Sequence, residues 1–278
     1  MEGPSLIGHN SDTPLAVMTS ILLIGTGRMA YHLGHAMVKA KLPLIGVAGR
    51  NPEKLNDLAR FLDRPAHRLD RPLPHADLVI VATSDDSIAE VAARIPEGWA
   101  TVAHTAGAVG IDVLAPHAHR AVIWPVQTLS HGAPIDLSDV PLAVEGSTPE
   151  AEAAILRLAR AMSQSVLQMP HRQRELLHLT AVLASNFPVF LMHEAQRLLK
   201  QEKLPPNLLM PLWKLTAQKV TTIGPAEALT GPARRGDISS VKRHLELLQG
   251  EPDLRRAYAQ LSSMVLKAHG HDPDGIDL

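Results

Sequence analysis

The chain contains no cysteine among its 278 residues, and aromatic residues make up only 3% of it. The lack of cysteine excludes disulfide bonds, thiol catalysis and cysteine-ligated metals. Acidic and basic side chains nearly balance at a formal net charge of −1, so neither nucleic acid nor an anionic membrane is a predicted partner. No uninterrupted apolar run approaches the roughly 20 residues of a membrane span. Together these features predict a soluble, cytoplasmic protein.

The N-terminal segment, residues 1–19, is rich in glycine and proline and carries Glu2 and Asp12. It lacks the basic and apolar regions of a signal peptide, so we expect a disordered tail. The remaining chain is long enough for about two domains. A change of pattern at Met169 and Pro170 divides it into an α/β domain at residues 20–169 and an all-α domain at residues 170–278.

The most informative stretch is a G-x-G-x-x-A motif that directly follows the apolar run Ser20–Ile24. Gly25 suits the tight turn out of a strand, Gly27 lets a pyrophosphate approach the backbone, and Ala30 lets the next helix pack closely. The N-terminus of that helix offers free N–H groups to phosphates. The motif therefore predicts a dinucleotide site made by Gly25, Thr26, Gly27, Arg28, Met29 and Ala30.

The residue that follows the second predicted strand favours NADP(H) over NAD(H) as the cofactor. An NAD-binding unit usually has an acidic residue there, whereas this chain has Arg50 and Asn51. A guanidinium matches the charge and geometry of the ribose 2′-phosphate, and Arg28 lies close by in the sequence. The alternative is a surface arginine at the end of a strand.

Alternating strand and helix patterns continue to Gln168 and predict a doubly wound, mostly parallel Rossmann sheet. The strand Ala76–Thr83 is followed by Ser84, and we expect Thr83 and Ser84 beside the cofactor because ligands bind at the carboxyl ends of such strands. Asp85 and Asp86 are interpreted as caps of the next helix, and residues 64–75 as an irregular connection. Further strands are predicted at residues 43–49, 100–107, 120–128, 140–145 and 165–168, with helices at residues 29–41, 52–63 and 149–162.

From His171 onward only helical periodicity is evident. The first helix is predicted at residues 171–200, with a kink or break near Asn186 because Pro188 lies inside it. Further helices are predicted at residues 205–223, 237–249 and 252–269.

The chain resembles the NADP-dependent oxidoreductases that join a Rossmann-like domain to a helical C-terminal domain of unassigned function. The residues that carry the resemblance are Ile24–Gly27, His104–Gly107, Ala184–Phe187 and, most specifically, Leu229–Asp237. Relatives of this family include pyrroline-5-carboxylate reductase, ketopantoate reductase and the 6-phosphogluconate dehydrogenase group. The resemblance implies a 6-phosphogluconate dehydrogenase-like helical domain, a substrate in the cleft between domains and a homodimer formed through the helices. One departure is Trp124–Pro125, where the family tends to have His-Pro.

Three residues are candidates for catalysis. Related hydroxyacid dehydrogenases use a Lys and an Asn one turn apart, and Asn186 matches the Asn, but Val182 stands in place of the Lys. His178, two turns before Asn186, is a candidate proton donor, or alternatively a histidine bonded in a domain seam. His104 follows a strand toward the expected nicotinamide, or alternatively bonds its own turn.

Thr105, Thr230 and Arg235 are candidates for substrate binding. Arg235 suits a carboxylate; alternatively it forms an internal salt bridge with Thr230 and Asp237, of which Asp237 is expected to cap the following helix. The histidines show no metal-ligand spacing, so no metal site is predicted.

The leading functional hypothesis is an NADP(H)-dependent dehydrogenase or reductase that acts on a small carboxylate-bearing carbonyl or imine, with a ketopantoate-like 2-oxo acid as the first candidate. The alternative is a catalytically silent dinucleotide-binding sensor or interaction protein. A third possibility is a deazaflavin-linked NADP oxidoreductase. Fold alone does not decide among them.

Overall fold

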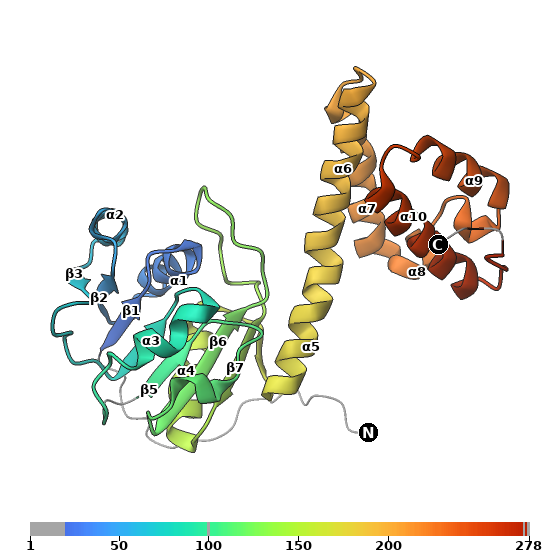
Figure 1. Ribbon diagram of the computed structural model, residues 1–278. Helices are drawn as coiled ribbons and strands as arrows, with labels where there is room; N and C mark the ends of the chain where they lie inside the picture. The colour runs from blue at the N-terminus through green and yellow to red at the C-terminus, as the bar shows by residue number, and fades with distance from the viewer. Residues whose placement is uncertain (1–19, 99–100, 275, 277–278) are drawn as a thin grey trace. The chain divides into compact units, whose positions relative to one another are not determined.

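Residues 20–98, 101–274 and 276 are described by the computed structural model, and the predicted tail at residues 1–19 lies outside them. The chain divides into two compact units, with the boundary between Phe190 and Leu191. The first unit contains a sheet of eight strands in the order β3-β2-β1-β4-β5-β6-β7-β8 (Figure 1). Neighbouring strands run parallel except β6 and β7, so the predicted doubly wound, mostly parallel sheet is confirmed. The strands are β1 (Ile21–Ile24), β2 (Leu44–Gly49), β3 (Ala66–Arg68), β4 (Leu78–Val81), β5 (Thr101–His104), β6 (His119–Pro125), β7 (Leu142–Gly146) and β8 (Val166–Gln168).

The central strands are short apolar runs because both faces of the sheet are covered. Alternate residues of β1 point to opposite faces: Ile21 and Leu23 belong to one core cluster, and Leu22 and Ile24 to the other. The first cluster is completed by three helices, α1 (Arg28–Lys39), α2 (Pro52–Leu62) and α4 (Pro149–Met162). The second is covered by α3 (Ile88–Ala92). The strand order changes direction at β1, so the carboxyl ends of β1 and β4 flank the position where such sheets bind ligands.

Two details of the first unit differ from the sequence prediction. The stretch predicted to be irregular contains β3, which pairs in parallel with β2 through Val47 and Ala66. Its three residues have no apolar pattern because β3 is a short edge strand, largely exposed. Asp85 and Asp86 lie inside a 3₁₀ turn, η1 (Asp85–Ser87), and neither caps it, so that prediction is wrong. A capping side chain comes from the extended residue before the turn. Here that residue is Ser84, and its side chain makes no capping hydrogen bond either.

After Gln168, every regular element in the described part of the chain is helical, which confirms the all-α C-terminal half. Asp237 caps α9 as predicted: its carboxylate accepts the Ser240 N–H at 3.0 Å. The hydrogen bond from the Ser240 hydroxyl, together with this backbone N–H and the Ser239 hydroxyl, lowers the pKa of Asp237 to about 2. The helices are α5 (His171–Ala181), α6 (Phe187–Gln201), α7 (Met210–Ile223), α8 (Pro225–Ala228), α9 (Ile238–Leu247) and α10 (Pro252–Ala268).

The irregularity predicted near Asn186 is a π-helical turn, η3 (Val182–Asn186), which joins α5 to α6 without a break. Pro188 has no N–H to donate to the preceding turn, and a widened turn before it relieves the clash of its ring. In a regular α-helix, Asn186 would lie about 80° around the axis from His178. A π turn takes up one extra residue, which reduces that angle to about 20°. The two side chains therefore point to nearly the same side of the helix.

One helix among the described residues, His171–Gln201, is long and apolar enough by length and composition to cross a membrane. Its most apolar window has a mean hydropathy of 1.4, and none of that window is buried. Isolated polar residues interrupt the apolar ones, so no uninterrupted apolar run marks this helix in the sequence. Exposed apolar surface of this extent is typical of an interaction site.

Candidate functional site

The G-x-G-x-x-A motif forms the turn between β1 and α1. Gly25 has φ +136°, and a Cβ there would lie 2.2 Å from the carbonyl oxygen of Ala82, so only glycine fits. The Gly25 N–H donates to the Ala48 carbonyl at 2.8 Å. The turn is therefore held between the ends of β2 and β4.

Gly27 is a different kind of glycine. It precedes α1 with an ordinary φ of −86°, and a Cβ there would meet nothing within 4 Å. The N–H groups in the first turn of any helix have no intrahelical acceptors, and in α1 no side chain caps them either. Ala30 is fully buried, as close packing of α1 requires, whereas Arg28 is exposed. The turn is an open cradle of backbone donors, and its residues fit a diphosphate.

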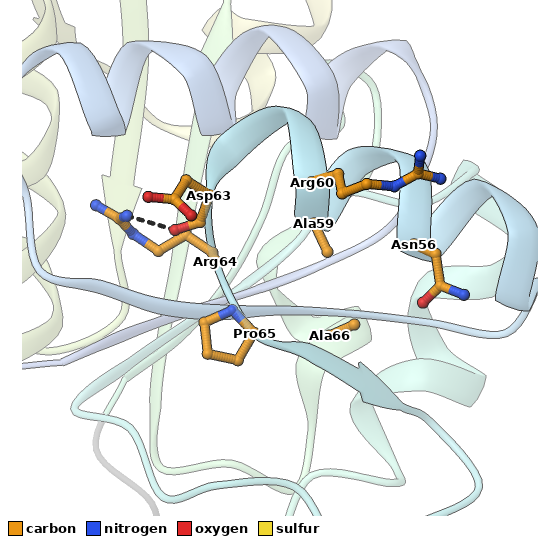
Figure 2. A pocket seen from close by; sticks show the side chains of 7 residues that line it. All are labelled: Asn56, Ala59, Arg60, Asp63, Arg64, Pro65 and Ala66. Carbon is orange, nitrogen blue, oxygen red and sulfur yellow. Dashed lines mark hydrogen bonds between the residues drawn. The ribbon is translucent and has the colours of Figure 1, made fainter.

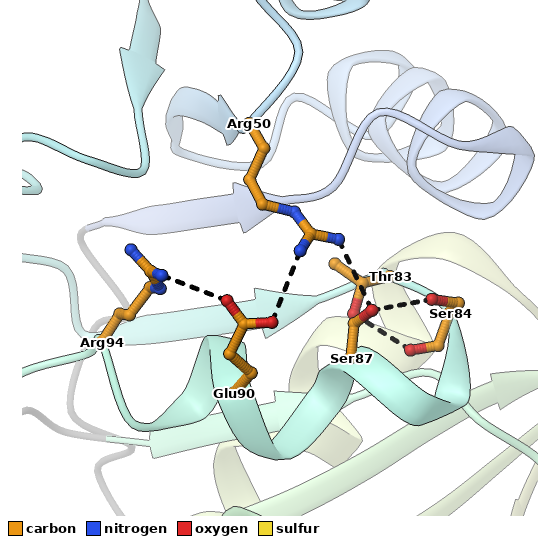
Figure 3. Close-up of polar contacts among 6 residues, drawn as sticks. All are labelled: Arg50, Thr83, Ser84, Ser87, Glu90 and Arg94. Atoms are coloured by element: carbon orange, nitrogen blue, oxygen red, sulfur yellow. Dashed lines mark hydrogen bonds and ion pairs between the residues drawn. The ribbon is translucent and has the colours of Figure 1, made fainter.

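Arg50 lies directly after β2, on the same side of the sheet as the motif. Its guanidinium contacts the Glu90 carboxylate at 3.4 Å and the Ser87 hydroxyl at 3.5 Å, and the side chain is 56% exposed (Figure 3). Such a long, exposed ion pair contributes little to stability, so the guanidinium is free to turn to a stronger anion. The Asn51 side chain is engaged differently, since its oxygen accepts the Lys54 N–H and caps α2.

Thr83 and Ser84 follow β4, the neighbour of β1. Ser84 is exposed and its hydroxyl lies 2.9 Å from that of Ser87, while the Thr83 hydroxyl donates to the Ser84 carbonyl at 3.4 Å (Figure 3). Both lie beside the glycine turn, because β4 pairs with β1 and the Ala82 N–H donates to the Ile24 carbonyl at 2.7 Å. The sheet thus brings the motif, Arg50 and this pair to one edge.

His104 ends β5 and is fully buried, with Thr105 nearly so. Its Nδ1 accepts the Ala106 N–H at 3.1 Å, whereas Nε2 has no partner among the described residues. Burial, reinforced by the charge of Arg174, lowers the pKa of His104 to about 4. The ring is therefore neutral at physiological pH and holds its own turn.

His178 on α5 meets the turn after β5 and the end of β6. Its ring centroid lies 5.5 Å from that of Trp124, and Gly107 fills the corner between the rings. A Cβ on Gly107 would lie 2.7 Å from the indole and 2.8 Å from the imidazole. Met29 of the glycine motif packs against the same apolar cluster as Trp124. These contacts connect the predicted phosphate turn to His178 through one indole.

Arg174, one turn before His178, is fully buried and was not anticipated from the sequence. Its guanidinium contacts the Glu145 carboxylate, the Val109 carbonyl and, at 3.2 Å, Nδ1 of His171. The signal in the sequence was its spacing: Arg174 shares a helical face with Leu177 and His178. An isolated arginine at such a position is otherwise read as solvent-exposed.

The remaining predicted residues lie elsewhere. Asn186 is exposed in the π turn of the first unit. Thr230 and Arg235 are exposed in the second unit, where Arg235 forms no ion pair with Asp237, so that alternative is not observed among the described residues. The described residues also contain no group of three or more side chains suited to a metal ion.

A pocket of about 570 Å³ lies elsewhere, between the end of α2 and the start of β3 (Figure 2). It opens at the amino end of β3, away from the carboxyl ends that carry the motif, and contains none of the predicted site residues. We assign it no role in the site. Its lining is Asn56, Ala59, Arg60, Asp63, Arg64, Pro65 and Ala66.

The neutral state of His104 predicts a loss of stability in acid. The unfolded chain binds a proton near pH 6.5, but the folded chain does so only near pH 4, so lowering the pH across this window favours unfolding. This one group removes about 3 kcal/mol of stability between pH 7 and pH 4. Urea denaturation at several pH values should show a flatter dependence for His104→Asn, and no change for the exposed control His131→Asn. An equal slope in His104→Asn and the wild type would contradict the buried neutral ring.

Two family models match different parts of the chain. Residues 12–117 match the family described as shikimate / quinate 5-dehydrogenase, and residues 140–265 match a domain of unknown function, DUF2520. A search of curated proteins finds no match.

Solved structures extend the likeness to most of the chain. A "putative NADP oxidoreductase" from Bacteroides fragilis is 33% identical, with a TM-score of 0.83, over 90% of this chain and 98% of that one. A protein from Thermotoga maritima is 22% identical, with a TM-score of 0.71, over 90% of this chain and 98% of its own. A pyrroline-5-carboxylate reductase from Coxiella burnetii, 15% identical with a TM-score of 0.53 over 91% and 98%, shares the fold alone. Because identity and coverage with the Bacteroides protein are both high, the chain belongs to the family of Rossmann-fold oxidoreductases that carry a helical C-terminal domain.

Proposed function

We propose that this protein is an NADP(H)-dependent dehydrogenase or reductase that transfers a hydride to or from a carbonyl or imine of a small carboxylate-bearing substrate. The observation that carries the proposal is Gly27. Neither its φ nor its surroundings require glycine, yet it stands at the uncapped N-terminus of α1. A glycine at this position, beside open space and free donors, suits a ligand that approaches the backbone.

The residues have separate tasks in this proposal. The backbone N–H groups of Thr26 to Ala30 bind the diphosphate, and Arg50, with Arg28, binds the ribose 2′-phosphate. Asn51, Thr83 and Ser84 line the same edge of the sheet. The nicotinamide, when bound, supplies or accepts the hydride.

Proton transfer is assigned to α5. Reduction of C=O or C=N requires a proton on the oxygen or nitrogen, and imidazole titrates near neutral pH. His104 is neutral and held by its own turn, whereas His178 is half-buried beside Trp124, so we assign the proton transfer to His178. Asn186, brought to the same side of the helix by the π turn, orients the substrate or the nicotinamide amide.

The substrate class is a 2-oxo acid of ketopantoate type or an imine carboxylate. Thr105 lies beside His104, and Arg235 and Thr230 have exposed side chains without an observed partner in the described structure. We assign the substrate carboxylate to Arg235 because a guanidinium binds it bidentately. Failure of NADPH oxidation with every acid tested, despite tight NADPH binding, would instead favour a silent dinucleotide sensor.

The first experiment replaces Gly27 with serine. A serine hydroxyl at this position caps α1, so the variant without ligand should be as stable as the wild type or more so. The same hydroxyl occupies the donors that would bind phosphate, so NADPH affinity should fall at least about tenfold.

Thermal shift with NADPH measures both effects, since a ligand that binds only the folded state raises the melting temperature. NADPH oxidation with a panel of 2-oxo acids and cyclic imine carboxylates tests turnover in parallel. Gly250→Ser is the control, because Gly250 also has ordinary φ and open space. Wild-type affinity in Gly27→Ser would refute the site.

The second experiment tests cofactor preference through Arg50. Arg50→Ser should weaken NADPH binding by about 10- to 100-fold, the effect of losing a hydrogen bond to a charged group, and leave NADH binding within about twofold. Arg94→Ser is the matched control, because Arg94 contacts the same Glu90 carboxylate at 3.1 Å. Calorimetry with both cofactors decides; equal losses for NADPH and NADH would contradict the assignment.

We further propose that the protein is a homodimer formed through its helices. Among the residues that the structure describes, sixteen of the twenty exposed large apolar side chains lie between Leu176 and Leu229, and α7 is exposed along its whole length. A surface of this extent is suited to an interface. Lys214 and Lys219 on α7 make a second copy a better occupant than lipid.

Light scattering after size exclusion should therefore give a dimer. Leu212→Glu with Leu215→Glu should give a monomer, whereas Leu247→Glu on α9, at an 81% exposed leucine, should not. A wild-type monomer at micromolar concentration, or sedimentation with neutral lipid vesicles, would contradict the proposal.

A further inference from the structure

Arg174 is a charged side chain with no solvent exposure, and its partners come from separate parts of the first unit. Glu145 belongs to β7, Val109 follows β5, and His171 belongs to the first turn of α5. One guanidinium therefore ties the start of α5 to β7 and to the loop that follows β5. Its Nε has no partner among the described residues.

Stability is a poor explanation for this arrangement. A buried ion pair is often no more stabilising than apolar side chains of the same size, because both charges must be removed from water. Its directional hydrogen bonds do fix geometry. The bonds to Glu145 and Val109 set both the rotation of α5 and its position along its axis.

The geometry that Arg174 fixes includes His178. The two residues lie four apart on α5, so their side chains share one face of the helix. On that face the imidazole lies against Trp124, with Gly107 in the corner between the rings. Gly107 belongs to the same loop as Val109, whose carbonyl accepts from Arg174. Both the Arg174 hydrogen bond and the packing of His178 therefore connect α5 to the loop that follows β5.

We propose that Arg174 is a positioning residue that holds the imidazole of His178 against Trp124 and Gly107 at the carboxyl edge of the sheet. The proposal rests on the proposed function for the statement that His178 acts in turnover. The placement of the imidazole itself is testable without a substrate.

Trp124 serves as a reporter of this placement. The chain has three tryptophans, so a Trp99→Phe, Trp213→Phe background leaves Trp124 as the single emitter. The imidazole of His178 lies against the indole of Trp124, so His178→Gln in this background should change the emission intensity of Trp124 at a fixed, neutral pH. That change is the reference signal for loss of the contact between His178 and Trp124.

In this background Arg174→Met should produce at least half of the change in Trp124 emission that His178→Gln produces. Arg172→Met, at an exposed arginine two residues earlier on α5, should leave the emission unchanged. Arg174→Lys should produce a smaller change than Arg174→Met, because an ammonium keeps the charge but lacks the fork geometry with which arginine reaches both long-range acceptors. Unchanged emission in folded Arg174→Met overturns the proposal. Should circular dichroism show that Arg174→Met does not fold, Arg174→Lys decides by the same criterion.

Turnover provides the second readout. With the acid or imine carboxylate that the wild type reduces, Arg174→Met should lower kcat by about 10- to 100-fold, the cost of a misplaced group, with KM for NADPH within about twofold. A rise in KM with unchanged kcat overturns the positioning role. If the wild type oxidises no NADPH while the fluorescence behaves as expected, the proposed function fails and the positioning role stands.

Discussion

The close approach of Gly25 to the Ala82 carbonyl is the constraint on which the site depends. Only a residue without a Cβ passes between the ends of β2 and β4, and this passage starts α1 at the carboxyl edge of the sheet. The uncapped first turn of α1 then points its N–H groups to the edge where Arg50, Thr83 and Ser84 also emerge. The fully buried Ala30 completes the arrangement because it lets α1 pack against the strand it follows.

A second set of contacts joins this edge to the first long helix. Met29 and Trp124 share an apolar cluster, Trp124 lies against His178, and Arg174 fixes the helix that carries His178. The departure noted in the sequence at Trp124–Pro125 therefore has a structural consequence. An indole at the end of β6 offers no proton, but it lies against the imidazole on α5 that we propose as the proton donor.

The π turn shows how a local irregularity serves this arrangement. Pro188 disfavours a regular helix, and the widened turn at Val182–Asn186 absorbs it without a break. The extra residue also rotates Asn186 toward the side of His178. The same turn begins at Val182, the position at which related hydroxyacid dehydrogenases would have a lysine.

The sequence by itself determined the architecture, the glycine turn and the helix cap at Asp237. These depend on local patterns: apolar periodicity, a glycine spacing and a side chain that bonds three residues ahead. It also anticipated a Rossmann oxidoreductase through motifs of neighbouring residues. It missed the edge strand β3, whose pairing is set by β2 and not by its own residues, and it wrongly assigned caps to Asp85 and Asp86. Only the tertiary structure decided that His104 is buried and neutral, that Trp124 meets His178 and that Arg174 is inside. Burial and contact depend on segments tens of residues apart, and no local pattern encodes which of them meet.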